Sequence, residues 1–385
     1  MSQKKIFQNF DFFLLFLIIL LTSFGLIGIA LATRSPVEGT DGAVSDAIGS
    51  FNLQQVKLQI TWFVTGLVIM AVVVSIDYHT ISDLAVYAYW VVVGLLIVVM
   101  FFGTKGGGAQ SWIEFGPFRM QPSEFSKVAL ILMLARIMAK REEEGINNLK
   151  TFGLLFLTLA IPFVLTVKQP DMGTAMVLVV IFTGMIFVGG IKYKHLFIVL
   201  GLAIAAVPVV WYTFLDDYQK NRILVYLNPG MDPLGDGYHV LQSIMSIGSG
   251  QMTGQFGREG LLSVNLLSQL DFLPAKDTDF VYSVTTEALG FVGGIAIIVL
   301  FYLLLMRTMR IAKRSRDTLG SYICVGVASM ILFHVFENIG MAMGIMPITG
   351  IPLPFMSYGG SSMWTNMIAF GLVLNVGMRR QKINF

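Results

Sequence analysis

The sequence has little charge: 13% of its 385 residues are Asp, Glu, Lys or Arg, whereas 55% are hydrophobic. A soluble globular domain carries about 25% charged residues. The low charge therefore excludes an ordinary soluble fold. The formal net charge of +3 says little by itself, because in a membrane protein the distribution of Lys and Arg matters more than their sum. We expect a membrane-embedded protein with no nucleic-acid partner.

Cysteine is nearly absent as well. The single residue, Cys324, lies in an apolar run, so we expect no intrachain disulfide and no cysteine-based metal site. No internal repeat is evident, and an inverted-repeat transporter architecture therefore has no support.

Apolar runs of about 20 residues recur along the chain, which is the length of a helix that spans a bilayer. They predict an all-α polytopic membrane protein, because a chain within hydrocarbon must satisfy its backbone polar groups internally. We interpret residues 1–385 as a single membrane domain with about ten transmembrane helices. The predicted spans are 11–33, 58–76, 81–102, 122–139, 151–168, 172–190, 194–215, 280–306, 320–344 and 361–378.

Basic residues gather in the loops on one side of these spans. The positive-inside rule places such loops in the cytoplasm, and an even number of crossings places both termini there. We therefore predict a multi-pass protein of the cytoplasmic (inner) membrane. The basic residues of this side are Lys4, Lys5, Arg136, Lys140, Arg141, Lys150, Lys192, Lys194, Arg307, Arg310, Lys313, Arg314, Arg316, Arg379, Arg380 and Lys382.

The opposite, extracytoplasmic side has most of the carboxylates and a loop, 216–279, that is far longer than a connection requires. Aromatic and apolar residues in this loop favour an ordered structure against the membrane. The prolines and glycines of 345–360 forbid a continuous helix and predict a re-entrant segment before the last span. These carboxylates include Glu114, Glu124, Asp171, Asp216, Asp217, Asp232, Asp236, Asp271, Asp277 and Asp279.

Asp279 stands at the mouth of the apolar segment 280–306. A carboxylate so close to hydrocarbon is costly, and its default interpretation is a functional group that faces protein or water. The position therefore predicts a reaction centre at the membrane edge.

Four polar clusters interrupt the hydrophobic pattern at the extracytoplasmic ends of spans. In the first, Glu124 and Lys127 are three residues apart and share one helical face. In the second, Pro170 breaks the chain between Lys168 and Asp171. A capped helix start and a plain turn are the structural alternatives. The clusters are 108–127, 168–174, 238–280 and 338–362.

The four clusters together resemble, in their order, spacing and residues, the motifs of the SEDS family of bacterial cell-wall polymerases. The resemblance extends over essentially the whole chain. The segments Ser268–Pro274 and Gly350–Pro354 are more similar to the RodA branch, which serves elongation, than to the FtsW division branch. A sporulation-specific SpoVE-like relative remains an alternative.

The resemblance implies a peptidoglycan glycosyltransferase that polymerises lipid II at the outer face of the membrane and works with a class B penicillin-binding protein. Thr278-Asp279-Phe280 matches the motif whose aspartate is essential, so Asp279 inherits the catalytic role. The residues that match positions lining the central, substrate-binding cavity of the family are Trp112, Arg119, Glu124, Lys127, Lys168 and Asp171.

The chain departs from the family pattern at three positions. Asp277 replaces a histidine, Ser111 replaces an arginine, and Ala288 follows Glu287 where many members have paired glutamates. The departures weaken any role for the missing groups and leave Asp279 unaffected.

Extending a glycan from a lipid-pyrophosphate donor needs a base for the acceptor hydroxyl, which we assign to Asp279. It also needs positive charge at the departing pyrophosphate. Glu124 and Asp171 would orient these cations or help to hold Mg²⁺ or Mn²⁺, although no dedicated metal motif is present. Structural pairing with nearby carboxylates is the alternative for the cations. The candidate cations are Arg119, Lys127 and Lys168.

Two functions of other classes stay open. Intramembrane charge around a cavity also fits a flippase that moves lipid II, and a non-catalytic scaffold of the cell-wall complex would fit the same composition. Clustering of acidic groups at one face favours chemistry over transport. In the ninth span, His334 and Glu337 are three residues apart and predict a buried polar pair.

Overall fold

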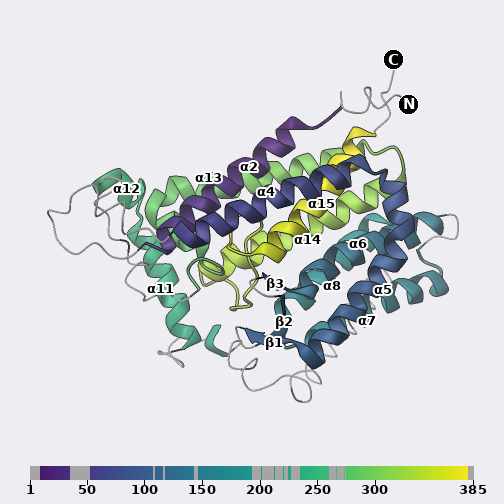
Figure 1. The fold of residues 1–385 in the computed structure, drawn as a ribbon, viewed down its shortest axis with the longest axis horizontal. Coiled ribbons are helices and arrows are strands. Elements are labelled where there is room, and N and C mark those ends of the chain that lie inside the picture. Colours follow the sequence, from purple (N-terminus) through teal and green to yellow (C-terminus); the bar gives the residue numbers. More distant parts are fainter. Residues whose placement is uncertain are drawn as a thin grey trace.

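The computed structural model describes residues 9–34, 53–106, 109–115, 118–142, 146–192, 224–226, 235–259 and 275–379, with isolated residues between 201 and 273. Long helices run side by side along one axis (Figure 1). Among the described residues, six helices are long and apolar enough to cross a membrane. They are α2 (Phe12–Ala32), α4 (Leu53–Ser75), α5 (Tyr78–Phe102), α7 (Leu149–Lys168), α13 (Val281–Lys313) and α14 (Thr318–Ala342).

Three further helices complete the described part of the bundle: α6 (Pro122–Lys140), α8 (Met172–Val188) and α15 (Gly360–Met378). Every predicted span except 194–215 coincides with one of these nine helices, and 194–215 lies almost entirely outside the described residues. The predicted all-α, multi-span fold is confirmed. Two short helices, α11 (Asp236–Ser249) and α12 (Gly254–Glu259), belong to the long loop 216–279.

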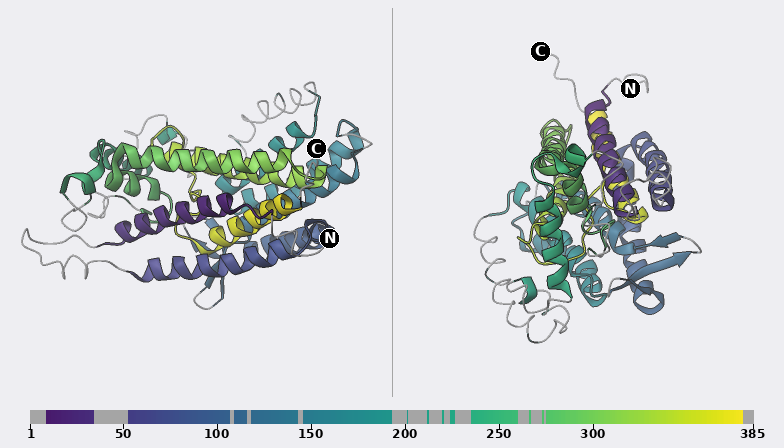
Figure 2. Two further views of the ribbon diagram at one scale, coloured as in Figure 1. Left: turned by 90° about the horizontal axis from the view of Figure 1, so that it is seen from above. Right: turned by 90° about the vertical axis from the view of Figure 1, so that its left-hand side faces the viewer.

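The bundle is built around α14, which packs against α6, α8, α13 and α15. The outer helices α2, α4 and α5 pack on α13, α15 and α6, respectively, as the views in Figure 2 also show. Large apolar side chains stay exposed on the outer helices, among them Tyr87, Phe101 and Phe102 of α5. Such a surface fits hydrocarbon rather than water.

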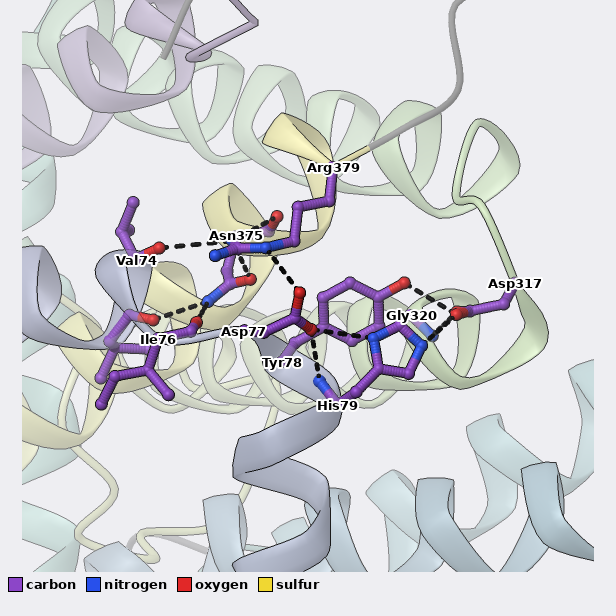
Figure 3. A network of polar contacts seen from close by, with 10 residues as sticks. Val74, Ile76, Asp77, Tyr78, His79, Asp317, Gly320, Asn375 and Arg379 are labelled. Carbon is purple, nitrogen blue, oxygen red and sulfur yellow. Dashed lines mark hydrogen bonds and ion pairs between the residues drawn. The ribbon is translucent and has the colours of Figure 1, made fainter. Parts of the chain in front are cut away.

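A polar network closes one end of the bundle (Figure 3). His79 lies 2.8 Å from a carboxylate oxygen of Asp77 and 2.6 Å from one of Asp317, to which the Tyr78 hydroxyl also donates. Arg379 pairs with Asp77 at 3.1 Å. Burial raises the pKa of the Asp77 carboxyl, but hydrogen bonds from His79 and the charge of Arg379 outweigh it, and the pKa lies below its usual value. The network joins the α4–α5 turn to α14 and α15. We call the end of the bundle that contains this network and the basic residues Arg136, Arg307 and Arg379 the basic end.

α13 is interrupted at Gly290, which has φ 72° and ψ −170°. The interruption frees two backbone N–H groups: that of Phe291 donates to the Gln251 carbonyl at 2.7 Å, and that of Val292 to the Met252 carbonyl at 3.3 Å. These bonds fasten the turn between α11 and α12 to α13. The described part of the large loop is therefore ordered, as predicted.

Replacing Gly290 by alanine is expected to destabilise the fold. The added Cβ would lie 2.3 Å from the backbone nitrogen of Gly254, and the backbone strain alone costs about 1–3 kcal/mol. Gly94→Ala is the control, because a Cβ at this helical position meets nothing within 4 Å and alanine favours a helix by about 1 kcal/mol. Thermal unfolding of the purified proteins in detergent compares the two, and an unchanged Tm for Gly290→Ala would contradict the expectation.

A small antiparallel sheet follows α5, between the predicted spans 81–102 and 122–139. Its strands are β1 (Thr104–Gly106), β2 (Ala109–Phe115) and β3 (Phe118–Met120), in the order β1-β2-β3. Glu114 of β2 lies opposite Arg119 of β3. The sheet contacts α5, α6 and α15, and so carries the first polar cluster to the start of α6.

The stretch between α14 and α15, residues 343–359, is irregular and folds back into the bundle. Residues 353–357 are buried although they belong to no helix. Backbone without regular structure is tolerated at this depth only where protein surrounds it. The predicted re-entrant segment is thus present, and we call it the 343–359 loop.

Candidate active site

A cavity of about 390 Å³ opens at the end of the bundle opposite the basic end. Helices α6, α13 and α15 each begin beside this cavity and run toward the basic end, where Arg136, Arg307 and Arg379 make their ion pairs. The cavity walls come from β2, β3, the start of α6, the α7–α8 turn, the turn before α13 and the 343–359 loop. Of the predicted site residues, those that line the cavity are Trp112, Arg119, Glu124, Asp171 and Asp279.

Asp279 belongs to a tight turn, residues 275–280, that leads into α13. The Ala275 carbonyl accepts the N–H groups of Thr278, Asp279 and Phe280 at 3.2, 2.9 and 3.2 Å. The Asp279 side chain is partly exposed and faces Gly350 of the 343–359 loop, where an added Cβ would lie 3.6 Å from its Oδ2 atom. The turn therefore presents a carboxylate to the cavity.

Glu124 and Lys127 form the predicted ion pair on the first turns of α6, at 2.6 Å, with side chains only 4% and 1% exposed. Lys127 Nζ also lies 3.1 Å from Nε2 of His334, whose Nδ1 is 3.0 Å from the Pro352 carbonyl. Because a carbonyl only accepts, Nδ1 carries the imidazole proton and Nε2 accepts from the ammonium. Lys127 thus lies beneath the cavity, held by two partners.

The predicted pair of His334 and Glu337 does not form. The imidazole of His334 instead contacts Lys127 of α6 and the Pro352 carbonyl of the 343–359 loop. The Glu337 carboxylate is fully buried and makes no hydrogen bond to His334.

Asp171 caps α8 and holds the start of α6 at the same time. One oxygen accepts the Thr174 N–H at 3.0 Å, and the other accepts from Gln121 and Ser123 at 3.1 and 3.0 Å. Both oxygens are engaged with protein, so the geometry favours a positioning role. Lys168, the other charged residue of this cluster, is exposed at the end of α7 and is absent from the cavity wall.

Arg119 is the cation that the structure places at the cavity wall. Its Nε lies 2.9 Å from Glu114 across the β2–β3 pair, and its side chain is 69% exposed. An exposed guanidinium can still donate to an anion, because its fork presents five N–H groups. Trp112, on β2, lies partly buried in the same wall.

The carboxylates of this cavity fit a protein-built metal cage poorly. Within the described ranges, no group of three His, Cys, Asp or Glu side chains lies close enough to hold a metal ion. Asp171 has both oxygens engaged, and Glu124 accepts from Lys127. A Mg²⁺ or Mn²⁺ ion here would take most of its ligands from substrate phosphates and water.

Sequence reasoning did not select several cavity-lining residues, although they lie inside the polar clusters: Gln121, Tyr358 and Ser361. Each is neutral, so its position at the end of a span carries no cost that marks it as functional. The Ser361 hydroxyl accepts the Gln121 N–H at 3.0 Å, which joins the starts of α15 and α6.

Known proteins match this chain in sequence. The FtsW/RodA/SpoVE family model, described as cell cycle protein, matches residues 12–382. The peptidoglycan glycosyltransferase MrdB of Escherichia coli K12 is 37% identical over 319 residues, 83% of this chain and 84% of that protein. RodA of Treponema pallidum is 34% identical over 444 aligned positions, covering 97% and 98%, and the stage V sporulation protein E of Bacillus subtilis is 37% identical over 326, covering 83% and 86%.

Solved structures match the fold as well. A chain of a peptidoglycan synthase complex that coordinates polymerization and crosslinking superposes with TM-score 0.76 at 30% identity, covering 96% of this chain and 97% of that one. The rod shape determining protein RodA of Thermus thermophilus gives TM-score 0.69 at 27% identity, covering 97% and 98%. The chain therefore belongs to the FtsW/RodA/SpoVE family, the SEDS family that its four polar clusters predict.

Proposed function

We propose that this protein is a peptidoglycan glycosyltransferase that polymerises lipid II into glycan strands, with Asp279 as the general base. The observation that carries the proposal is the Asp279 carboxylate, held by a tight turn at the wall of a cavity at one end of the helical bundle. The Escherichia coli and Treponema pallidum relatives are named peptidoglycan glycosyltransferases, which supports the same activity, and the similar rod shape determining protein RodA favours a role in cell elongation and shape.

The reaction joins two lipid-linked disaccharides. The acceptor hydroxyl attacks the anomeric carbon of the donor, a C–O bond forms, and the C–O bond to the lipid pyrophosphate breaks. The Asp279 carboxylate takes the hydroxyl proton and later returns it to water. Gly350, which the carboxylate faces, has no side chain that would cover it.

Positive charge at the departing pyrophosphate lowers the barrier further. Arg119 is suited to this task, because its guanidinium lies at the cavity wall and is largely exposed. The Lys127 side chain is only 1% exposed and is paired with Glu124. Lys168 does not line the described cavity, so it would contact only a part of the substrate that extends beyond this cavity. We therefore assign the first contact with pyrophosphate to Arg119, and we expect a divalent cation, if one takes part, to arrive with the phosphates.

The positive-inside rule places the basic end in the cytoplasm, with both termini, and the cavity at the outer face. From Val128 to Met138, most α6 side chains below the cavity are buried. A carrier needs access from both sides, whereas this cavity is closed toward the basic end by α6 and its neighbours. This arrangement supports chemistry over flipping.

A class B penicillin-binding protein is the proposed partner, since a similar chain lies in a complex that couples polymerization to crosslinking. The single transmembrane helix of this partner would pack on the exposed apolar surface of α13 and α14. The most exposed large apolar residues there are Phe291, Val292, Tyr302, Leu332 and Phe336.

The function is tested with purified protein in detergent, alone and with a cognate class B penicillin-binding protein, supplied with labelled lipid II. We expect ladders of glycan products. No product under either condition, together with movement of lipid II across vesicle bilayers, would contradict the proposal and indicate a flippase. Neither product nor movement would indicate a scaffold.

A further inference from the structure

Three donors from outside the turn that carries Asp279 bind three successive carbonyl groups of that turn. The Asp277 carbonyl accepts the backbone N–H of Tyr358 at 2.9 Å. The Thr278 carbonyl accepts the Ser357 hydroxyl at 2.5 Å, and the Asp279 carbonyl accepts the Asn338 side-chain amide at 2.8 Å. Two of these donors belong to the 343–359 loop and the third to α14, so the turn is fixed from outside its own helix.

Asn338 joins the two walls between which Asp279 lies. Its amide nitrogen has two hydrogens, and they go to the Asp279 carbonyl and to the Ile351 carbonyl, both at 2.8 Å. Ile351 is the neighbour of Gly350, the residue that the Asp279 carboxylate faces. One fully buried amide therefore sets the separation between the residue that carries the carboxylate and the loop across from it.

Ser357 and Gln59 extend the same support to α4. The Ser357 hydroxyl accepts the Leu353 N–H at 2.8 Å while it donates to Thr278, and this fixes the direction of its proton. Gln59 is fully buried on α4; its amide donates to the Ser357 carbonyl at 3.0 Å and accepts the Gly359 N–H at 3.2 Å. Gln59, on α4, thus fixes the position of Ser357, and Ser357 in turn binds the 275–280 turn.

We propose that Asn338, Ser357 and Gln59 are positioning residues for Asp279, which aim its carboxylate into the cavity through the backbone of the 275–280 turn. The inference rests on the proposed function, because it assigns a task to the surroundings of the proposed base. None of the three lines the cavity. Each acts through hydrogen bonds to the turn or to the loop beside it.

Loss of one such bond is expected to lower kcat more than it changes KM. Displacement of a catalytic group by about 1 Å can cost about 100-fold in rate, because the geometry of proton transfer is strict. Substrate contacts at Trp112 and Arg119 lie on the sheet, away from α14, and would persist. We expect a 10- to 100-fold lower kcat, with KM within about twofold.

The test compares Asn338→Leu with Asn375→Leu. Asn375 is also fully buried and also donates to two backbone carbonyls, those of Val73 and Ile76, but it lies in the polar network at the basic end (Figure 3). A purely structural role for Asn338 predicts similar losses of Tm and of activity in the two variants. The positioning role predicts a loss of kcat in Asn338→Leu alone, measured with labelled lipid II on the folded fraction of each purified protein.

A second pair of variants decides the matter if Asn338→Leu does not fold. Ser357→Ala removes the donor to Thr278, whereas Ser357→Thr keeps a hydroxyl at the same place. We expect Ser357→Ala to lose kcat at least tenfold and Ser357→Thr to recover most of it, with unchanged KM in both. Wild-type kcat in folded Ser357→Ala or in folded Asn338→Leu would overturn the inference.

An Asp279→Asn sample in the same assay separates this inference from the proposed function. If Asp279→Asn is inactive while the Asn338 and Ser357 variants are fully active, only the positioning role is wrong. If Asp279→Asn keeps wild-type activity, Asp279 is not the base, and there is no catalytic group for the three residues to position.

Discussion

Replacing Lys127 by methionine is expected to lower the free energy of unfolding by about 3–5 kcal/mol. The substitution keeps the length of the side chain but leaves the Glu124 carboxylate, 4% exposed, without its ammonium partner. Removing one partner of a buried ion pair costs this much because the remaining charge cannot return to water. It also removes the donor to His334 Nε2. Thermal or denaturant unfolding in detergent measures the loss.

Two companion variants identify the cause. Adding Glu124→Gln to Lys127→Met removes the uncompensated charge and is expected to restore much of the stability. Arg119→Met breaks the ion pair between Arg119, whose side chain is 69% exposed, and Glu114, whose side chain is 38% exposed. This substitution should change the free energy of unfolding by less than about 1 kcal/mol. Equal effects of Lys127→Met and Arg119→Met would contradict a specific role for burial.

Hydrophobic runs predicted the spans because a bilayer imposes a length and a polarity on every crossing helix, whatever its neighbours. The ends were less accurate: α13 continues to Lys313, seven residues beyond the predicted end at 306, since its basic last turns extend past the apolar run. The break at Gly290 was not predicted, because glycine is frequent in membrane helices and only contact with Gln251 and Met252 shows its purpose.

The charged residues of the candidate site were predictable from the sequence, because a charged side chain near hydrocarbon is costly. Asp279 stood out because a carboxylate beside hydrocarbon needs a reason, and Glu124 because it shares a helical face with Lys127; both carboxylates line the cavity. Their partners are set by tertiary contacts that no local pattern contains. His334 lies 207 positions from Lys127, and Gln59 lies 298 from Ser357. The motif Ser268–Pro274 falls almost entirely outside the described residues, and its role stays a prediction.

Replacing Asp279 by asparagine is expected to lower the rate of glycan polymerisation by about 100- to 10,000-fold. Asparagine keeps the shape of the side chain but cannot take a proton from the acceptor hydroxyl, and general base catalysis contributes this much to rates. The 275–280 turn should persist, because it is held through backbone groups and through Asn338, Ser357 and Tyr358.

Asp277→Asn is the matched control. Asp277 carries the same charge two residues earlier, and its carbonyl accepts from Tyr358, but its side chain is absent from the cavity wall. The substitution therefore changes the local charge equally and leaves the proposed base in place. We expect near wild-type polymerisation from this variant.

The decisive measurement is the initial rate of glycan formation from labelled lipid II by purified wild-type, Asp279→Asn and Asp277→Asn proteins, each with wild-type Tm. Ladders from wild type and Asp277→Asn, with essentially none from Asp279→Asn, are the predicted result. Ladders of wild-type yield from folded Asp279→Asn protein would contradict the assignment of the base, and with it the proposed mechanism.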